Sequence, residues 1–242
     1  MRIPRIFHSQ SLTPASQIAL NANASHHLAK VLRLGIGAPL RLFDGHGGEY
    51  LSSIIEINKR EVIVTVGEHQ LIDLESPLKV TLAQGISKGE RMDYTLQKAV
   101  ELGVQRIVPL NTERSVVNLK GDRQERKLEH WRGVIISACE QCGRNTLPEL
   151  LPMQSLDNWI RDEPRNLRLL LDHRANAGIS DLNKSVDLTL LIGPEGGLSE
   201  NERDNAYAAG YCGLRLGPRV LRTETAALTA MAALQSHWGD LI

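Results

Sequence analysis

The sequence lacks long apolar runs, has only three cysteines and carries no excess charge of either sign. Its longest nearly apolar stretch, Ala226–Leu234, is much shorter than the ~20 residues that a membrane-spanning helix needs. The first residues contain no apolar segment typical of a secretory signal, and three cysteines cannot build a disulfide framework. We therefore expect a cytoplasmic protein that does not bind a membrane. Lys and Arg number 28, as do Asp and Glu, which argues against general binding to polyanions.

Charge is nevertheless unevenly distributed along the chain. Residues 1–43 contain no Asp or Glu, whereas residues 44–75 contain seven acidic side chains and only two basic ones. A stretch of one sign is typical of a nucleic-acid-binding face, to which His8, His26 and His27 would add polar contacts. The alternative is an ordinary solvated surface, and charge alone leaves both interpretations open. The basic residues of the first stretch are Arg2, Arg5, Lys30, Arg33 and Arg41.

The pattern of the first part of the chain predicts short strands joined by tight turns. Strands are expected at 39–44, 49–57 and 61–66, with Asn58-Lys59-Arg60 as a hairpin connection. Ser25 is expected to cap a short helix whose Leu28, Val31 and Leu32 share one face. Short strands with tight turns favour a small barrel or closed sheet, so we predict a first domain over residues 1–72.

From Leu78 onward, strand patterns alternate with helical ones. This alternation predicts an α/β domain over residues 73–242, with a parallel sheet covered on both faces. Ser199 and Glu202 have the spacing of a capping box at the start of one helix. The expected strands are 78–85, 104–110, 167–171, 187–192 and 211–216, and the expected helices are 90–102, 123–142, one beginning at Ser199, and 223–237.

Two glycine-containing loops follow strands of this domain, at 193–197 and 216–227. Ligands of open α/β sheets bind beyond the carboxyl ends of the strands, and glycine lets the backbone approach a ligand closely. The first loop is not a P-loop, because no Lys-Ser/Thr follows, and its spacing is not GxGxxG. The two loops therefore either hold a nucleoside through backbone contacts or are ordinary turns between a strand and a helix. The charged residues near the same edge favour a site: Glu195, Arg219, Arg222 and Glu224.

Two further segments carry reactive residue types. Arg114-Ser115 follows a strand and suits either phosphate binding or plain surface exposure. Cys139-x-x-Cys142 lacks the second ligand pair that zinc commonly uses, and it lies at a helix end rather than at the helix start typical of redox sites. No metal site is predicted, and a polar face is favoured there, made by Glu140, Gln141 and Arg144.

Taken in order, several motifs resemble one known family. The chain is similar to the bacterial small-subunit ribosomal RNA uracil-N3 methyltransferases, a branch of the knotted SPOUT class. Two departures are mild: Cys142 stands where Ser is expected, and Leu198 where an aromatic residue is expected. The matching motifs are Arg2-x-x-Arg5-x-Phe7, His27-Leu28-x-x-Val31-Leu32-Arg33, Lys88-Gly89-x-Arg91-Met92, Gln97 to Val104, Glu113-Arg114-Ser115-Val116, Glu140 to Arg144, Leu191 to Gly197, and Leu216-Gly217-x-x-Val220 to Ala226.

The resemblance implies an N-terminal PUA-like, RNA-binding β-barrel and a SPOUT parallel-sheet domain with a C-terminal trefoil knot. It also implies S-adenosylmethionine (SAM) as the cofactor, a homodimer, and methylation at N3 of a specific uridine of 16S rRNA, expected on the assembled 30S subunit.

The resemblance also implies the site residues. Arg114 and Arg222 are expected to stabilise the uracil anion or anchor phosphate, and Glu224 to remove the N3 proton or orient the ring; in a dimer, Arg114 would serve the partner's pocket. The expected cofactor-binding residues are Leu171, Asp172, Ile192, Gly193, Pro194, Glu195, Gly196, Gly197, Leu216, Gly217, Val220, Leu221, Arg222, Thr223 and Ala226. The expected RNA-binding residues are Arg2, Arg5, His27, Lys30, Arg33, Lys88, Arg91, Arg114 and Arg144.

Three rival functions remain to be weighed. The basic stretch also suits a non-catalytic RNA-binding or ribosome-assembly protein, which has no need for SAM. A SPOUT enzyme that modifies another RNA position is the second rival. A dinucleotide-dependent oxidoreductase is the third, but the correctly spaced glycines and the acidic residue after the second strand are missing.

Overall fold

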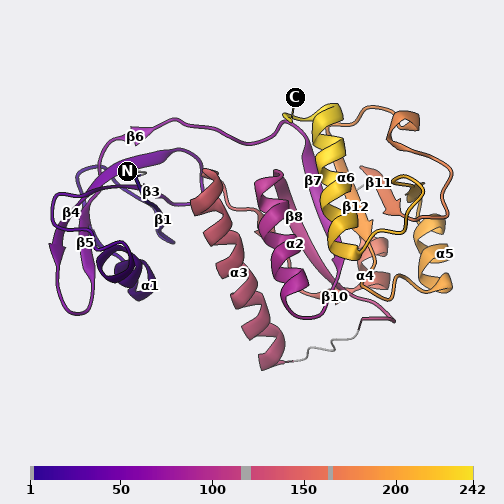
Figure 1. The fold of residues 1–242 in the computed structure, drawn as a ribbon, viewed down its shortest axis with the longest axis horizontal. Helices are drawn as coiled ribbons and strands as arrows, with labels where there is room; N and C mark the ends of the chain where they lie inside the picture. Colours follow the sequence, from indigo (N-terminus) through magenta and orange to yellow (C-terminus); the bar gives the residue numbers. More distant parts are fainter. Residues whose placement is uncertain (1–2, 116–120, 163–165, 242) are drawn as a thin grey trace. The chain divides into compact units, whose positions relative to one another are not determined.

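The structure is a computed structural model that describes residues 3–115, 121–162 and 166–241, and it divides the chain into two compact units (Figure 1). The first unit comprises Met1–Glu75 and Cys139–Leu147, and the second comprises Ser76–Ala138 and Pro148–Ile242. The return of Cys139–Leu147 to the first unit is absent from the sequence prediction, which assigned everything after residue 72 to the second domain.

A six-stranded sheet forms the first unit, in the order β1-β3-β4-β5-β2 with β6 paired to β4. Only the β1–β3 pair is parallel. The hairpin connection is confirmed, because Asn58 Oδ1 accepts hydrogen bonds from the amides of Arg60 and Glu61 at 2.8 and 2.9 Å. In the described part of the chain β1 and β2 are not paired, so this ladder is open rather than closed. The strands are β1 (Arg5–Phe7), β2 (Gln17–Ala19), β3 (Pro39–Phe43), β4 (Glu49–Ile57), β5 (Val62–Thr65) and β6 (His69–Gln70).

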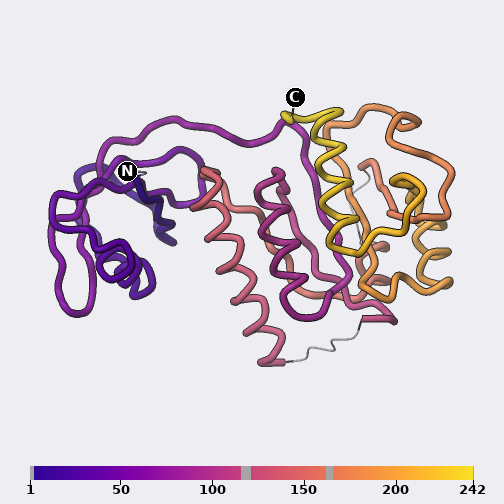
Figure 2. Tube along the Cα trace, in the orientation of Figure 1, coloured from indigo at the N-terminus to yellow at the C-terminus, as the bar shows by residue number. Residues whose placement is uncertain are grey.

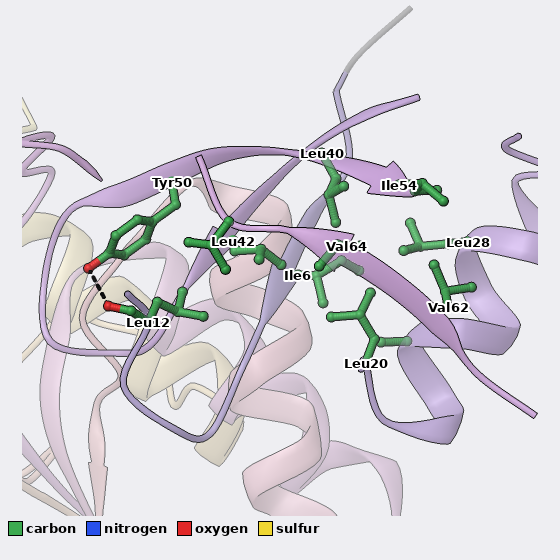
Figure 3. Packing of buried hydrophobic residues seen from close by; sticks show 12 residues of the cluster. Ile6, Leu12, Leu20, Leu28, Leu40, Leu42, Tyr50, Ile54, Val62 and Val64 are labelled. Carbon is green, nitrogen blue, oxygen red and sulfur yellow. Dashed lines mark hydrogen bonds between the residues drawn. The ribbon is translucent and has the colours of Figure 1, made fainter. Parts of the chain in front are cut away.

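Alternating side chains of these strands build an apolar core (Figure 3). Leu40 and Leu42 of β3 and Val64 of β5 are fully buried, as the period of two along a strand requires. At the end of this core the Tyr50 hydroxyl donates to the Leu12 carbonyl at 3.3 Å, so the buried phenol keeps a hydrogen-bond partner.

The short helix of the first unit differs from its prediction. Helix α1 (Ala22–His26) begins after Asn21, whose side chain accepts from the amide of Ala24 at 2.9 Å, and a π-helical turn (His27–Val31) follows. Ser25 is therefore not the cap but a buried residue inside the helix. Because the helix starts earlier and continues with a π-helical turn, only Leu28 of the predicted stripe is buried. Val31 and Leu32 are 58% and 42% exposed.

The second unit contains a seven-stranded, wholly parallel sheet in the order β10-β8-β7-β12-β11-β13, with β9 paired to β8. The predicted alternation of strands and helices is confirmed, whereas the short β9 and β10 were not predicted. The strands are β7 (Lys79–Gly85), β8 (Val104–Asn111), β9 (Glu149–Leu150), β10 (Gln154–Ser155), β11 (Leu167–Leu171), β12 (Asp187–Ile192) and β13 (Cys212–Leu214).

Helix α5 begins at the predicted capping box. Ser199 Oγ accepts from the amide of Glu202 at 3.1 Å, and Glu202 Oε2 accepts from the amide of Ser199 at 2.8 Å. No helix in the described residues is long and apolar enough to cross a bilayer. The helices of this part of the chain are α2 (Glu90–Glu101), α3 (Asp122–Cys142), α4 (Leu156–Asp162), α5 (Glu200–Ala208) and α6 (Thr223–Trp238), and a 3-10 turn covers Ile179–Asp181.

The first and last helices of the second unit lie side by side, although they are far apart in sequence (Figure 2). Gln235 of α6 is fully buried, and its Nε2 donates to the Leu102 carbonyl at the end of α2 at 3.0 Å. Its Oε1 accepts from the Ser76 hydroxyl at 2.6 Å. The last helix is thereby tied to both the start of the unit and the end of α2.

Candidate active site

A cavity of about 570 Å³ lies where the loops after β12 and β13 meet the end of β11. This volume is within the range of small-molecule sites, about 300–1,000 Å³. Every residue predicted to bind the cofactor lines it, as do Arg114, Arg222 and Glu224. The two glycine-containing loops are therefore neighbours in space. Arg91, predicted to bind RNA, and Arg219, one of the charged residues expected near this edge, line the cavity too. Lining residues that were not predicted are Leu170, His173, Arg174, Leu198, Arg203 and Leu214.

Glycine is required in the walls of this cavity by close backbone approach. A Cβ on Gly193 would lie 2.9 Å from the amide nitrogen of Leu198, and one on Gly85 would lie 2.5 Å from the nitrogen of Pro194. Both neighbours are backbone atoms that no side-chain rotation can move away. The end of β7 and the loop after β12 are thus packed main chain to main chain, which leaves no room for a side chain on Gly85.

A chain of hydrogen bonds joins three segments beneath the cavity. The buried Gln84 Nε2 donates to the Thr223 hydroxyl at 2.9 Å, and that hydroxyl donates to the Gly193 carbonyl at 2.7 Å. The end of β7, the loop after β12 and the first residue of α6 are held together in this way. Because Arg222 and Glu224 flank Thr223, their backbone positions are set by the same chain.

Glu224 lies in the first turn of α6 and is half-buried. Its Oε2 is buried and has no hydrogen-bond partner within the described residues. An unsatisfied buried carboxylate oxygen is costly, so it is suited to a ligand that brings a donor. Arg222 is the N-cap residue of α6 and is exposed, which leaves its guanidinium available to a charged ligand.

Arg114 reaches the cavity from the turn after β8. Its NH1 donates to the Gly196 carbonyl at 3.1 Å, while the side chain is otherwise exposed. A guanidinium carries five N–H donors, so this bond leaves others free to meet a phosphate or a carbonyl.

Glu195 ties the loop after β12 to the start of α2. Its Oε1 accepts from the Lys88 amide at 2.9 Å and from Arg91 NH1 at 3.1 Å. Burial raises the pKa of the Glu195 carboxyl, but these hydrogen bonds outweigh burial and hold the pKa below its ordinary value. Of the predicted RNA-binding residues, Lys88 and Arg91 are thereby placed beside the cavity loop, and both side chains are exposed.

Asp172 closes the β11 side of the cavity. Its two carboxylate oxygens accept from the Tyr207 hydroxyl and the Arg174 amide, each at 2.9 Å. Burial and then this hydrogen bond raise the pKa of Tyr207 to about 12. Tyr207 and Arg174 were missed by sequence reasoning, since neither stands in a recognisable motif.

Two predicted RNA-binding arginines are buried instead of exposed. The side chain of Arg5 is 8% exposed and pairs with Glu49, and its NH2 donates to Asn145 Oδ1 at 2.7 Å. The side chain of Arg144 is 5% exposed and pairs with Glu75, to which its Nε donates at 3.0 Å. Both guanidinium groups form ion pairs inside the first unit, and Glu49 pairs with Arg41 as well, so burial argues against RNA contacts by Arg5 and Arg144.

Three further RNA-binding candidates of the first unit lie among the described residues and are exposed. His27 and Lys30 lie in the π-helical turn, and Arg33 follows it with a backbone φ of 53°. Arg2 lies outside the described residues, as does Val116 of the Arg114 motif.

Cys139 is fully buried, and burial raises the pKa of its thiol to about 12. A thiol protonated at neutral pH is a poor nucleophile and a poor metal ligand. In residues 3–115, 121–162 and 166–241 no group of three or more His, Cys, Asp or Glu side chains is arranged to hold a metal ion.

Comparison with known proteins places the chain in a family. The model of an RNA methyltransferase domain matches residues 74–235, and that of an RNA methyltransferase PUA domain matches residues 20–67. The relative named ribosomal RNA small subunit methyltransferase E from Buchnera aphidicola (subsp. Schizaphis graminum) is 37% identical, over 99% of this chain and 98% of its own length. Its namesake from Bacillus subtilis is 29% identical over 93% and 92%.

Comparison with solved structures supports the same family assignment. Ribosomal RNA small subunit methyltransferase E from Neisseria gonorrhoeae, bound to SAM, superposes with a TM-score of 0.95 at 38% identity. A Legionella pneumophila protein solved with SAM superposes with a TM-score of 0.97 at 42% identity. Both comparisons cover all of each chain. The fold and these matches define an RNA methyltransferase with a PUA domain. The chain belongs to the family of ribosomal RNA small subunit methyltransferase E.

Proposed function

We propose that this protein methylates N3 of a specific uridine of 16S rRNA, with SAM as methyl donor and the assembled 30S subunit as substrate. One observation carries the proposal: the two glycine-containing loops line one cavity together with Arg114, Arg222 and Glu224, and Glu224 has a buried carboxylate oxygen without a partner among the described residues. A non-catalytic RNA-binding protein would have no use for such a cavity.

The residues of the cavity fit SAM. Gly193, Gly196 and Gly197 line the cavity without side chains, so their main-chain groups can meet a nucleoside, and Ile192, Leu216 and Leu221 supply apolar walls. Leu171-Asp172 would form the wall opposite the glycine loops. When bound, SAM supplies a methyl group that is already activated by its sulfonium. The protein then has to orient the acceptor and make it nucleophilic.

Three side chains suit that task at uracil N3. The N3–H is a weak acid, and its removal leaves negative charge on the ring oxygens. Glu224 would accept the N3 proton or orient the N3–H, using the oxygen that has no partner in the described residues. Arg222 and Arg114 would stabilise the uracil anion or anchor a neighbouring phosphate.

RNA would be held by exposed basic residues of both units. Lys30, Arg33 and His27 are exposed in the first unit, and Lys88 and Arg91 are exposed in the second. Phosphates are commonly contacted by such side chains, whereas target bases are splayed out of the strand. Arg5 and Arg144 are not assigned RNA contacts, because each forms an ion pair inside the first unit.

Two architectural features belong to the proposal. We propose that the loop after β13 threads a trefoil knot, supported by its meeting with the loop after β12 at one cavity. We also propose a homodimer that works in the cytoplasm. Within it, Arg114 would serve the cavity of its own chain, because it already bonds to Gly196 of that chain. Light scattering at working concentrations tests the dimer.

The proposal is tested by transfer of a labelled methyl group from SAM to naked 16S rRNA and to 30S particles. We expect labelling of 30S particles, and we expect Arg222→Ala and Glu224→Gln each to slow transfer by about 10²-fold while SAM affinity changes little. Transfer by Arg222→Ala within about twofold of the wild-type rate would remove Arg222 from the mechanism. Absence of SAM binding in calorimetry would favour a non-catalytic RNA-binding protein.

A further inference from the structure

Glu202 is a buried carboxylate that the proposed reaction does not use. It is 4% exposed, lies in the first turn of α5 and is not itself one of the residues that line the cavity. Its Oε2 accepts from the Ser199 amide at 2.8 Å, and its Oε1 accepts from the Glu113 amide at 2.8 Å. A capping box needs only the first bond. The second bond joins α5 to the turn that follows β8.

Two hydrogen bonds between Thr112 and Ser115 close the turn that follows β8. Ser115 Oγ accepts from the Thr112 amide at 3.1 Å, and the Ser115 amide donates to the Thr112 carbonyl, also at 3.1 Å. Because both ends of the turn are joined, an external bond at the Glu113 amide restrains all four residues together. Glu202 supplies that bond.

Arg114 stands in the middle of the same turn. Its guanidinium bonds to the Gly196 carbonyl at 3.1 Å, and a Cβ built on Gly196 would lie 3.1 Å from the Cβ of Arg114. The turn therefore packs directly on the glycine loop at the cavity. A shift of a few tenths of an ångström in the turn would move Arg114 relative to the site.

We propose that Glu202 is a positioning residue: through the Glu113 amide it holds the turn that carries Arg114 against the Gly196 loop. A carboxylate suits this position because its two oxygens serve two amides at once and its charge strengthens both bonds. A glutamine side chain has one acceptor oxygen and cannot do both. The functional half of the proposal rests on the proposed role of Arg114 with the RNA substrate.

The structural half is tested by amide hydrogen exchange across residues 112–115 of the full-length protein. We expect Glu202→Ala to speed exchange of the Glu113 amide by about tenfold or more, since its acceptor is lost. Ser199→Ala is the matched control, because it weakens the cap of α5 but leaves the bond from Glu113 to Glu202. Unchanged exchange in Glu202→Ala would overturn the proposal. If that variant does not fold, Glu202→Gln keeps a residue compatible with the capping box and should change exchange in the same direction.

The functional half is tested by a double-mutant cycle on RNA methylation. We expect Glu202→Ala to raise KM for 30S particles roughly fivefold to tenfold, with SAM affinity unchanged, and Ser199→Ala to leave both near wild type. Because Glu202 acts through Arg114, Glu202→Ala in an Arg114→Ala background should add nothing. If the two substitutions instead multiply each other's effect on KM, the coupling between Glu202 and Arg114 is refuted. If Arg114→Ala alone does not impair methylation, the proposed role of Arg114 fails, while the exchange result still decides whether Glu202 holds the turn.

Discussion

The side chains of Gln84 and Thr223 are joined by a 2.9 Å hydrogen bond, although 139 positions separate them in the chain. Gln84 is the penultimate residue of strand β7, and Thr223 begins the last helix, α6. The Thr223 hydroxyl in turn donates a hydrogen bond to the Gly193 carbonyl at 2.7 Å. This pair therefore helps to hold the start of α6 and the loop after β12, which both line the cavity, against strand β7.

Thr223→Val tests this arrangement. Valine has nearly the same shape but can neither accept from Gln84 nor donate to Gly193, so both hydrogen bonds are lost, although Gln84 Nε2 keeps its bond to the Gly85 carbonyl. We expect the free energy of unfolding to fall by about 1–3 kcal/mol and SAM affinity to fall roughly tenfold. Urea denaturation and titration calorimetry measure both quantities. Thr225→Val, at an exposed position of the same turn, is the control, and equal behaviour of the two variants would contradict the account.

Gly193→Ala tests the close backbone approach. A Cβ there would meet the Leu198 amide nitrogen at 2.9 Å, so the loop after β12 must move away from its present position. We expect SAM binding to weaken by about tenfold or more, in line with the 1–3 kcal/mol typical of overpacking. Gly133→Ala is the control. Its Cβ would enter open space on α3, so it should add about 0.5–1 kcal/mol of stability and leave SAM affinity unchanged.

Charge reversal separates the exposed basic residues from the buried ones. Lys30→Glu with Arg33→Glu should weaken RNA binding and lower the salt slope of log K by about 0.7–0.9 per lost phosphate contact, without loss of stability. Lys59→Glu, in the hairpin turn of the same unit, should change the slope little. Arg5→Ala should instead lower the melting temperature, because it leaves Glu49 buried without this partner. Binding measured between 50 and 200 mM salt decides this; an unchanged slope in the double variant would refute the RNA contacts.

The sequence predicts most of the second unit because its signals are local. The alternation of strands and helices, the Ser199–Glu202 capping box and the glycine loops after strands each depend on residues a few positions apart. The meeting of the two loops follows from the rule that the carboxyl ends of parallel strands share one edge. All residues predicted to bind the cofactor accordingly line one cavity.

What the sequence analysis missed mostly concerns residues whose partners lie far away in the sequence. Arg5 pairs with Glu49, 44 residues away, and Arg144 pairs with Glu75, 69 residues away, so neither arginine is recognisably buried from its neighbours. The cap at Asn21 was missed because Ser25 also precedes an apolar run. The bond from Glu113 to Glu202 spans 89 residues and has no sequence signal at all.

The stability of the second unit should also depend on pH through Asp93. This carboxylate of α2 accepts from Trp131 Nε1 at 3.0 Å and from Lys127 and His130, all on α3. Burial raises the pKa of Asp93, but the bonds from His130 and Lys127 lower it below its ordinary value of 3.8. A lowered folded-state pKa means that Asp93 stabilises the fold above pH 3.8, and that this stability is lost as the pH falls through the folded-state value.

Urea denaturation between pH 3 and pH 6 measures this effect in the wild-type protein and in Asp93→Asn. Asn does not titrate, so the difference in unfolding free energy between the two proteins should shrink as the pH falls below about 4. Glu129→Gln, an exposed carboxylate of α3, should run parallel to the wild type. A constant difference between wild type and Asp93→Asn would show that Asp93 is not linked to folding.

Nucleoside analysis of the RNA product tests the central claim most directly. Purified 30S particles are incubated with the protein and SAM labelled in its methyl group, and the 16S rRNA is digested to nucleosides and separated by mass spectrometry. We predict that the label appears in 3-methyluridine and in no other nucleoside, and that Glu224→Gln abolishes most of it. Label in a different nucleoside, or none in any, would contradict the assignment of the cavity.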